Sequence, residues 1–123
     1  MGRGMVRGPK RFAYADILDD PPGALGGLIF PSVYPNWDNT PRAGRRGLVA
    51  IGSTPERFGA HVRRGIERAR AAPPGQQVLV IKSWNEWAEG NYLEPDTEFG
   101  RGRLEALASE LAAAGISLAP RSP

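Results

Sequence analysis

The feature that most constrains the fold is an uninterrupted apolar run, Val78-Leu79-Val80-Ile81, which leads into the polar and aromatic block from Trp84 to Gly90. A run without polar alternation is typical of a parallel strand that is buried on both faces. Parallel strands belong to α/β folds, in which the groups that do chemistry lie on loops after the carboxyl ends of the strands. The run therefore predicts a buried strand with a candidate site at its end.

The segment before this strand predicts a helix. Thr54 can cap its first turn, where Pro55 is well tolerated. The Pro73-Pro74-Gly75 sequence ends it. Between these limits, apolar residues recur every four positions and form one stripe against a face of Arg and Glu, namely Phe58, Val62 and Ile66.

The remaining elements complete an α/β order. We expect strands within residues 28–34 and 48–51, and a short helix or turn over residues 11–18. A final helix is expected to end at Gly115, because three leucines before it have helical spacing, namely Leu104, Leu107 and Leu111. Strands that alternate with helices in this way are typical of a parallel α/β sheet.

Composition argues against several classes of function. With 123 residues and a net charge of +3, the chain has the size of one domain. It has no cysteine, which excludes disulfides and thiolate metal sites. No apolar run approaches the ~20 residues of a membrane span, and the basic start is not a signal peptide, so we expect a cytoplasmic protein. The arginines are scattered without a nucleic-acid-binding motif, so no nucleic-acid partner is expected.

Neither a metal nor a cofactor is expected. The acidic residues between Glu86 and Glu98 do not follow the spacing of a calcium loop. His61 is the only histidine, and we expect it on the polar surface of the first long helix. At that surface position we expect no His-based catalytic triad, and a single histidine in a chain without cysteine does not supply the ligands of a typical zinc site.

Glu86 and Glu89 are the candidate catalytic residues. Glycosyl chemistry uses one carboxyl to donate a proton to the leaving oxygen, and a second as base, nucleophile or charge stabiliser. Residues three apart share a face where the chain makes a helical turn, and Gly90 permits such a turn directly after Glu89. Two solvated surface glutamates are the plain alternative, but the flanking tryptophans favour a functional pair.

All three tryptophans lie in two polar segments, residues 35–46 and 84–98. Trp37, Trp84 and Trp87 could each pack against the C–H face of a sugar ring. Indole rings also fill hydrophobic cores, and for Trp84, next to the predicted strand, both interpretations stay open. Trp37 and Trp87 favour the site.

A second polar group follows Trp37. Asp38, Asn39 and Arg42 can together hold several sugar hydroxyls, and an arginine offers a fork of donors to a carboxylate or phosphate. The same Asp-Asn-Thr-Pro string is also ordinary turn chemistry. Taken alone, the string favours the turn.

Several motifs occur together in a recognisable order. They are FAYAD at 12–16, PNWDNTPR at 35–42, GSTPERF at 52–58, WNEWAEG at 84–90, YLEPD at 92–96 and LEA at 104–106. Over residues 11–107 the chain resembles the C-terminal portion of the WbsX family, described as glycosyltransferases of surface-polysaccharide clusters with a domain like glycoside hydrolase family 99. The EWxEG element is also similar to that of the family 99 endo-α-mannosidases.

The resemblance implies a fold and a set of site residues. The fold would be α/β, the C-terminal part (about three βα units) of a (β/α)8 TIM barrel over residues 11–115, between a flexible basic leader at 1–10 and a frayed tail at 116–123. Glu86 and Glu89 would be the catalytic pair of a retaining mechanism, in which Glu86 assists attack by the sugar's own 2-hydroxyl and Glu89 acts as acid and base. The residues expected to bind the saccharide are Trp37, Asp38, Asn39, Arg42, Trp84, Asn85, Trp87, Tyr92 and Glu94.

The implied function is that of a carbohydrate-active enzyme, a hydrolase or transferase that acts on glycosidic bonds in bacterial O-antigen or lipopolysaccharide metabolism. No phosphate loop for a nucleotide sugar is visible, which favours hydrolase or transglycosylase chemistry. A whole barrel needs about 250 residues. A partial barrel would expose sheet edges, so we expect this chain alone to be poorly stable and inactive. The alternatives are a non-catalytic saccharide-binding remnant and an inactive truncated product.

Overall fold

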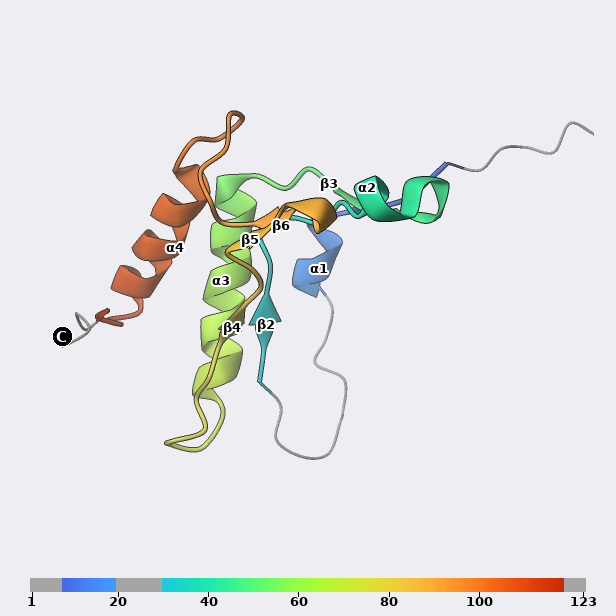
Figure 1. Cartoon of the computed structure of the whole chain (residues 1–123). Coiled ribbons are helices and arrows are strands. Elements are labelled where there is room, and N and C mark those ends of the chain that lie inside the picture. The colour runs from blue at the N-terminus through green and yellow to red at the C-terminus, as the bar shows by residue number, and fades with distance from the viewer. Residues whose placement is uncertain (1–7, 20–29, 119–123) are drawn as a thin grey trace, which may run out of the picture.

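The structure is a computed structural model that describes residues 8–19 and 30–118 (Figure 1). It mixes helices with short strands, and two of its helical turns, η1 and η2, are 3-10 helices. In chain order the elements are β1 (Lys10–Ala13), α1 (Asp16–Asp19), β2 (Ser32–Val33), α2 (Thr40–Ala43), η1 (Gly44–Arg46), β3 (Leu48–Ile51), α3 (Pro55–Arg70), β4 (Val80–Ile81), β5 (Asn85–Glu86), η2 (Trp87–Glu89), β6 (Asn91–Tyr92) and α4 (Gly102–Ala113).

The strands form three two-stranded sheets. β1 pairs in parallel with β3, from Lys10 opposite Leu48 to Ala13 opposite Ile51. β2 pairs in parallel with β4, and α3 lies between these two strands in the sequence. β5 and β6 form an antiparallel hairpin. The described chain is therefore a mixed structure with small sheets, and its place in a (β/α)8 barrel stays a prediction.

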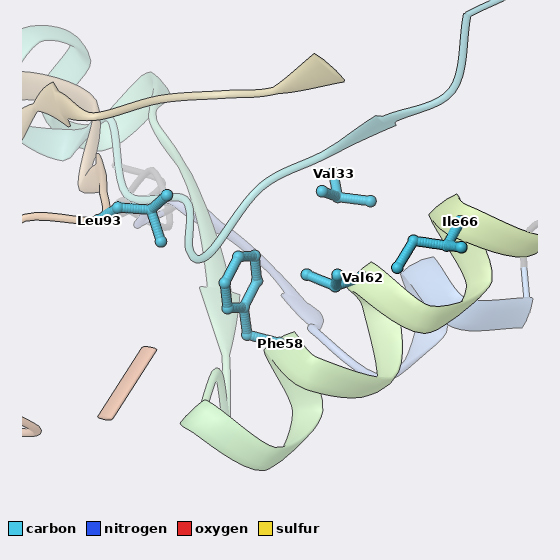
Figure 2. Close-up of a cluster of buried hydrophobic side chains, with 5 residues drawn as sticks. All are labelled: Val33, Phe58, Val62, Ile66 and Leu93. Carbon is cyan, nitrogen blue, oxygen red and sulfur yellow. The ribbon is translucent and has the colours of Figure 1, made fainter. Parts of the chain in front are cut away.

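Helix α3 carries the hydrophobic core on the stripe that its sequence periodicity predicts. Figure 2 shows the buried apolar side chains of α3 on one side of the helix, facing Val33 of β2 and Leu93, which follows β6. The buried cluster consists of Phe58, Val62, Ile66, Val33 and Leu93. Partly buried apolar side chains around β4 and α4 pack against it, namely Leu79, Ile81, Leu104, Leu107, Leu111 and Ala114. Both long helices are thus confirmed.

Two local features fix the position of α3. The Thr54 hydroxyl oxygen caps the helix, as predicted, by accepting a hydrogen bond from the Arg57 backbone N–H at 3.3 Å. Gly65 lies where the helix meets the strands, and a Cβ atom there would lie 2.7 Å from side-chain atoms of both Leu79 and Val33. This glycine therefore allows α3 to approach β2 and β4 closely.

The apolar run at residues 78–81 is not buried on both faces, so that prediction is wrong. Only its last two residues form β4, and Val78 and Val80 are 40% and 44% exposed. Leu79 and Ile81, which alternate with them, pack against the core. Helix α3 covers one face only, which leaves the other face accessible in the described part of the chain.

The N-terminal half also differs from its prediction. Residues 11–18 form β1 and then α1 rather than one helix or turn, because residues 10–13 pair with β3. Of the strand expected at 28–34, only Ser32–Val33 is a strand, and residues 28 and 29 lie outside the described ranges, as do 1–7 of the leader and 119–123 of the tail. Within the described ranges, no helix has both the length and the apolar character that crossing a membrane requires.

His61 is buried, so its expected surface position is wrong. Its Nδ1 lies 3.2 Å from the hydroxyl of Tyr14, which donates a 2.5 Å hydrogen bond to the backbone carbonyl of Tyr34. Both tyrosine rings meet the imidazole edge to face. Burial lowers the pKa of His61, and burial also raises the pKa of the Tyr14 hydroxyl. His61 therefore links α3 to Tyr14, in the segment after β1, through contacts in the protein interior.

Candidate functional site

The β5–β6 hairpin holds both candidate catalytic residues. Glu86 ends β5, and Glu89 ends the helical turn η2. Gly90 follows with a left-handed backbone (φ 58°), and a Cβ atom there would lie 2.9 Å from the backbone nitrogen of Asp38. Glycine meets both demands because it lacks a Cβ atom and tolerates positive φ. The turn predicted after Glu89 is therefore confirmed.

Arg42 in α2 bridges the two carboxylates. Its Nη2 lies 3.2 Å from Glu86 Oε1, and its Nη1 lies 3.5 Å from Glu89 Oε1. The loop before α2 is fixed to the hairpin by a 2.7 Å hydrogen bond, which the Asp38 backbone N–H donates to the Glu89 carbonyl. Both glutamates thus lie on the same side of the turn, as cooperation between two carboxyl groups requires.

Lys82 is a further residue of this cluster, and sequence reasoning missed it. Its Nζ lies 3.2 Å from Glu89 Oε2 and 4.7 Å from the centroid of the Trp37 ring. One sequence signal could have indicated this position. In an extended strand, residue 82 shares a face with residues 78 and 80 and is the first polar residue after the apolar run.

In the loop before α2, two of the residues predicted to bind saccharide accept hydrogen bonds from within the protein. Asp38 Oδ1 accepts hydrogen bonds from the backbone N–H and the hydroxyl of Thr40, at 2.9 and 2.6 Å. Asn39 Oδ1 accepts one from the Leu48 backbone N–H at 2.6 Å. These are the turn contacts that the sequence favours, and a role of Asp38 and Asn39 in saccharide binding stays a prediction. The Trp37 Nε1 is buried without a hydrogen-bond partner in the described part of the chain.

A second group of side chains is centred on Trp87, the first residue of η2. The rings of Trp87 and Tyr92 are stacked, with centroids 3.6 Å apart and an interplanar angle of 15°. Trp87 Nε1 donates a 2.5 Å hydrogen bond to Glu94 Oε2. The structure therefore brings together three of the residues predicted to bind saccharide, and Trp87 is fixed by both its ring and its N–H.

This aromatic pair is anchored to α4 through a buried ion pair. The Tyr92 hydroxyl donates a 3.1 Å hydrogen bond to Asp96 Oδ2, and the same oxygen accepts one from Arg103 Nη1 at 2.8 Å. Burial alone would raise the pKa of Asp96, but hydrogen bonds from the Phe99 backbone and Tyr92 and the charge of Arg103 outweigh it and lower that pKa. Burial, followed by the Asp96 carboxylate, raises the pKa of Tyr92. Sequence reasoning missed both Asp96 and Arg103.

Trp84 and Asn85 precede the glutamates and are exposed. The Trp84 backbone carbonyl accepts hydrogen bonds from the backbone N–H groups of Leu93 and Glu94, at 2.9 and 3.1 Å. The hairpin is thus closed by the main chain at Trp84, while its ring faces solvent and not the core. Within residues 8–19 and 30–118, no three His, Cys, Asp or Glu residues gather as a metal site would require.

Comparison with known proteins places this site in a family context. Residues 11–107 match the family described as Glycosyltransferase WbsX. The uncharacterized protein WxcX of Xanthomonas campestris pv. campestris, in two strains, is 38% identical to this chain over 79 residues. The match covers 63% of this chain and 11% of each relative, so the chain spans about a tenth of the length of these curated relatives. No solved structure matches the chain.

Proposed function

This chain belongs to the WbsX glycosyltransferase family, and from that membership we propose that it acts on glycosidic bonds through Glu86 and Glu89. The observation that carries the proposal is the shared contact of both carboxylates with Arg42, at 3.2 and 3.5 Å. A pair of carboxyl groups on one side of a turn is the arrangement that glycosyl chemistry uses. Family membership supports a carbohydrate substrate, and the contacts with Arg42 support the pairing of Glu86 with Glu89.

The proposed reaction retains the anomeric configuration in two steps. In the first step Glu86 takes the proton of the sugar's 2-hydroxyl, O2 attacks C1, and the C1–O bond to the leaving group breaks while Glu89 protonates the leaving oxygen. In the second step Glu89 takes a proton from water, the water oxygen attacks C1, and the C1–O2 bond of the 1,2-anhydro sugar opens as Glu86 returns its proton to O2. Two inversions at C1 give net retention. A sugar hydroxyl in place of water would make the same site a transglycosylase.

The proposed substrate is an oligosaccharide or polysaccharide of the bacterial surface. The stacked Trp87–Tyr92 pair supports a saccharide because a fixed, partly exposed indole offers a flat apolar face at low entropic cost. Arg42 is 59% exposed at its side chain, so its remaining N–H groups can reach a sugar hydroxyl beside the glutamates.

Against the expectation that this chain alone is inactive, the proposal predicts turnover by the purified chain. It is tested on a panel of α-linked oligosaccharides and surface polysaccharides, with new reducing ends as the readout. We expect turnover to fall by about 10²–10⁴-fold in Glu86→Gln and in Glu89→Gln, the usual contribution of acid–base catalysis. Glu98→Gln, an exposed glutamate of the same segment, is the matched control and should keep turnover. Full activity in both site variants, or neither turnover nor binding with any member of the panel, would refute the proposal.

A non-catalytic saccharide-binding module is the second candidate, and the exposed indoles favour it. Trp84 and Trp87 are 54% and 46% exposed, which is unusual for such large apolar side chains. Calorimetric titration of the same panel distinguishes the two functions. Binding that is lost in Trp87→Ala, without any turnover by the unchanged chain, would favour the binding module over the enzyme.

A further inference from the structure

Lysine is rare in this chain. Of its 16 basic residues only Lys10 and Lys82 are lysines, and the others are arginines. Lys10 is exposed in β1, whereas Lys82 contacts the Glu89 carboxylate and the Trp37 ring. One of the two lysine ammonium groups therefore lies directly at the candidate catalytic pair.

The backbone determines where the Lys82 side chain points. Its backbone N–H donates a 2.9 Å hydrogen bond to the Val33 carbonyl, which continues the β2–β4 pairing by one residue. Because side chains alternate along an extended strand, Lys82 lies on the face of Val80, away from the core that α3 covers. The ammonium thus reaches the hairpin from the strand side, and Arg42 reaches it from the loop side.

The two cations contact different oxygens of one carboxylate. Arg42 lies beside Oε1 of Glu89 at 3.5 Å, and Lys82 lies beside Oε2 at 3.2 Å. A carboxylate held at both oxygens cannot rotate freely about its last bond, whereas one held at a single oxygen can. The Trp37 ring, 4.7 Å from the ammonium, holds the other end of the bridge through the negative potential of its face.

We propose that Lys82 is a positioning residue for Glu89, held between that carboxylate and the Trp37 ring. The proposal deepens the proposed function and rests on it, because it assigns Lys82 a role in orienting the acid and base. It also gives Trp37 a role other than the sugar platform that its sequence suggests. In this role the face of the Trp37 ring holds the Lys82 ammonium in place through a cation–π contact.

The contact is tested without any substrate by ¹³C NMR after reductive ¹³C-methylation of the chain. The lysine dimethylamino signals are then only those of Lys10 and Lys82, and Lys82→Arg identifies the second. We expect the Lys82 signal upfield of the Lys10 signal, because the Trp37 ring current shields it. The shift should vanish in Trp37→Leu and persist in the control Trp84→Leu.

The orienting role is tested by replacing the Glu89 carboxylate with an amide and, separately, by removing the Lys82 ammonium. Glu89→Gln should move the Lys82 signal, and the control Glu98→Gln should leave it in place. On the substrate with the fastest turnover, Lys82→Met should lower kcat about tenfold with little change in KM, because orientation acts on the chemical step. Lys82→Arg should restore most of kcat, and Lys10→Met should match the unchanged chain.

Each result decides the proposal. A Lys82 signal without upfield shift, or one insensitive to Trp37→Leu and Glu89→Gln, would overturn it, as would an unchanged kcat in Lys82→Met. If the unchanged chain has no turnover, the proposed function fails. The Lys82 contact is then judged by NMR alone, where a response to Glu89→Gln supports it and the lack of one overturns it.

Discussion

The carboxylates of two carboxylate–cation groups lie only a few residues apart in the sequence but in different environments. In the first, the cationic side chains of Arg42 and Lys82 are 59% and 48% exposed, and the side chains of Glu86 and Glu89 are partly exposed at 36% and 22%. In the second, Asp96 and Arg103 are each 6% exposed. Exposed ion pairs contribute about 0–1 kcal/mol to stability, whereas breaking a buried pair costs about 3–5 kcal/mol. The comparison indicates that the buried pair holds the fold and that the exposed charges are available for chemistry.

The largest expected effect is on the buried pair. Arg103→Met leaves the Asp96 carboxylate buried without its cation and should lower the free energy of unfolding by about 3–5 kcal/mol in urea denaturation. The control is Arg63→Met, which removes an exposed pair with Glu110 (2.6 Å, Arg63 side chain 62% exposed) and should cost below about 1 kcal/mol. Equal losses of unfolding free energy in the two variants would contradict the difference between buried and exposed ion pairs.

A second prediction concerns the close packing of α3 against β2 and the segment of β4. Gly65→Ala places a Cβ atom 2.7 Å from Leu79 and Val33 and should destabilise the chain by about 1–3 kcal/mol. Gly59→Ala is the matched control on the same helix, since its Cβ would meet neighbours at 3.6 Å, an ordinary contact distance. That change should be neutral or stabilising, because alanine favours a helix over glycine. Thermal melts of the two variants compare them directly.

A third prediction concerns acid. The pKa of Asp96 in the folded chain lies below its ordinary value of 3.8, so the unfolded chain binds the proton first as the pH falls. The contribution of Asp96 to stability is therefore present above pH 3.8 and is lost as the pH falls through the lower folded value. Asp96→Asn should flatten this part of the stability curve, measured by urea unfolding between pH 5 and pH 2. An unchanged slope would contradict the role of the buried pair.

His61 gives a milder dependence at higher pH. Burial holds its pKa below the ordinary 6.5, so the unfolded chain gains the proton first and stability should fall as the pH drops below about 6.5. In His61→Gln the stability between pH 7 and pH 5 should depend less on pH. The Asp96→Asn variant keeps His61 and should retain the wild-type slope in this window.

The smallest effect on stability is expected in the exposed cluster. Arg42→Met removes the contacts with both glutamates, yet it should change the free energy of unfolding by below about 1 kcal/mol. Turnover should fall at the same time, because the two carboxylates lose their shared partner. A loss of stability as large as that of Arg103→Met would mean that the cluster holds the fold after all.

The sequence predicted what local pattern determines. The Thr54 cap, the apolar stripe of α3, the leucines of α4 and the turn at Gly90 all depend on residues within a few positions of each other. Burial of the run at 78–81 was mispredicted, because exposure depends on which elements cover a strand and not on its own composition. His61 was misplaced for the same reason, since Tyr14 and Tyr34 come from distant parts of the chain.

The candidate site was predictable in its acids and, among its cations, only in Arg42. Glu86 and Glu89 are recognisable from their spacing between tryptophans. Their pairing with Arg42 spans more than forty residues, and no local pattern marks it. Lys82 is marked in the sequence only as the first polar residue after the apolar run, and Arg103 is one of many arginines. Their ion pairs with Glu89 and Asp96 follow from tertiary structure alone.

The most direct test of the account is to measure turnover and the free energy of unfolding on one preparation of Glu89→Gln. We predict that this variant loses saccharide turnover by about 10²–10⁴-fold while its free energy of unfolding stays within about 1 kcal/mol of the unchanged chain. Turnover that survives, or a loss of stability as large as that of Arg103→Met, would contradict the claim that the partly exposed glutamate pair performs the chemistry and that the buried Asp96–Arg103 pair holds the fold.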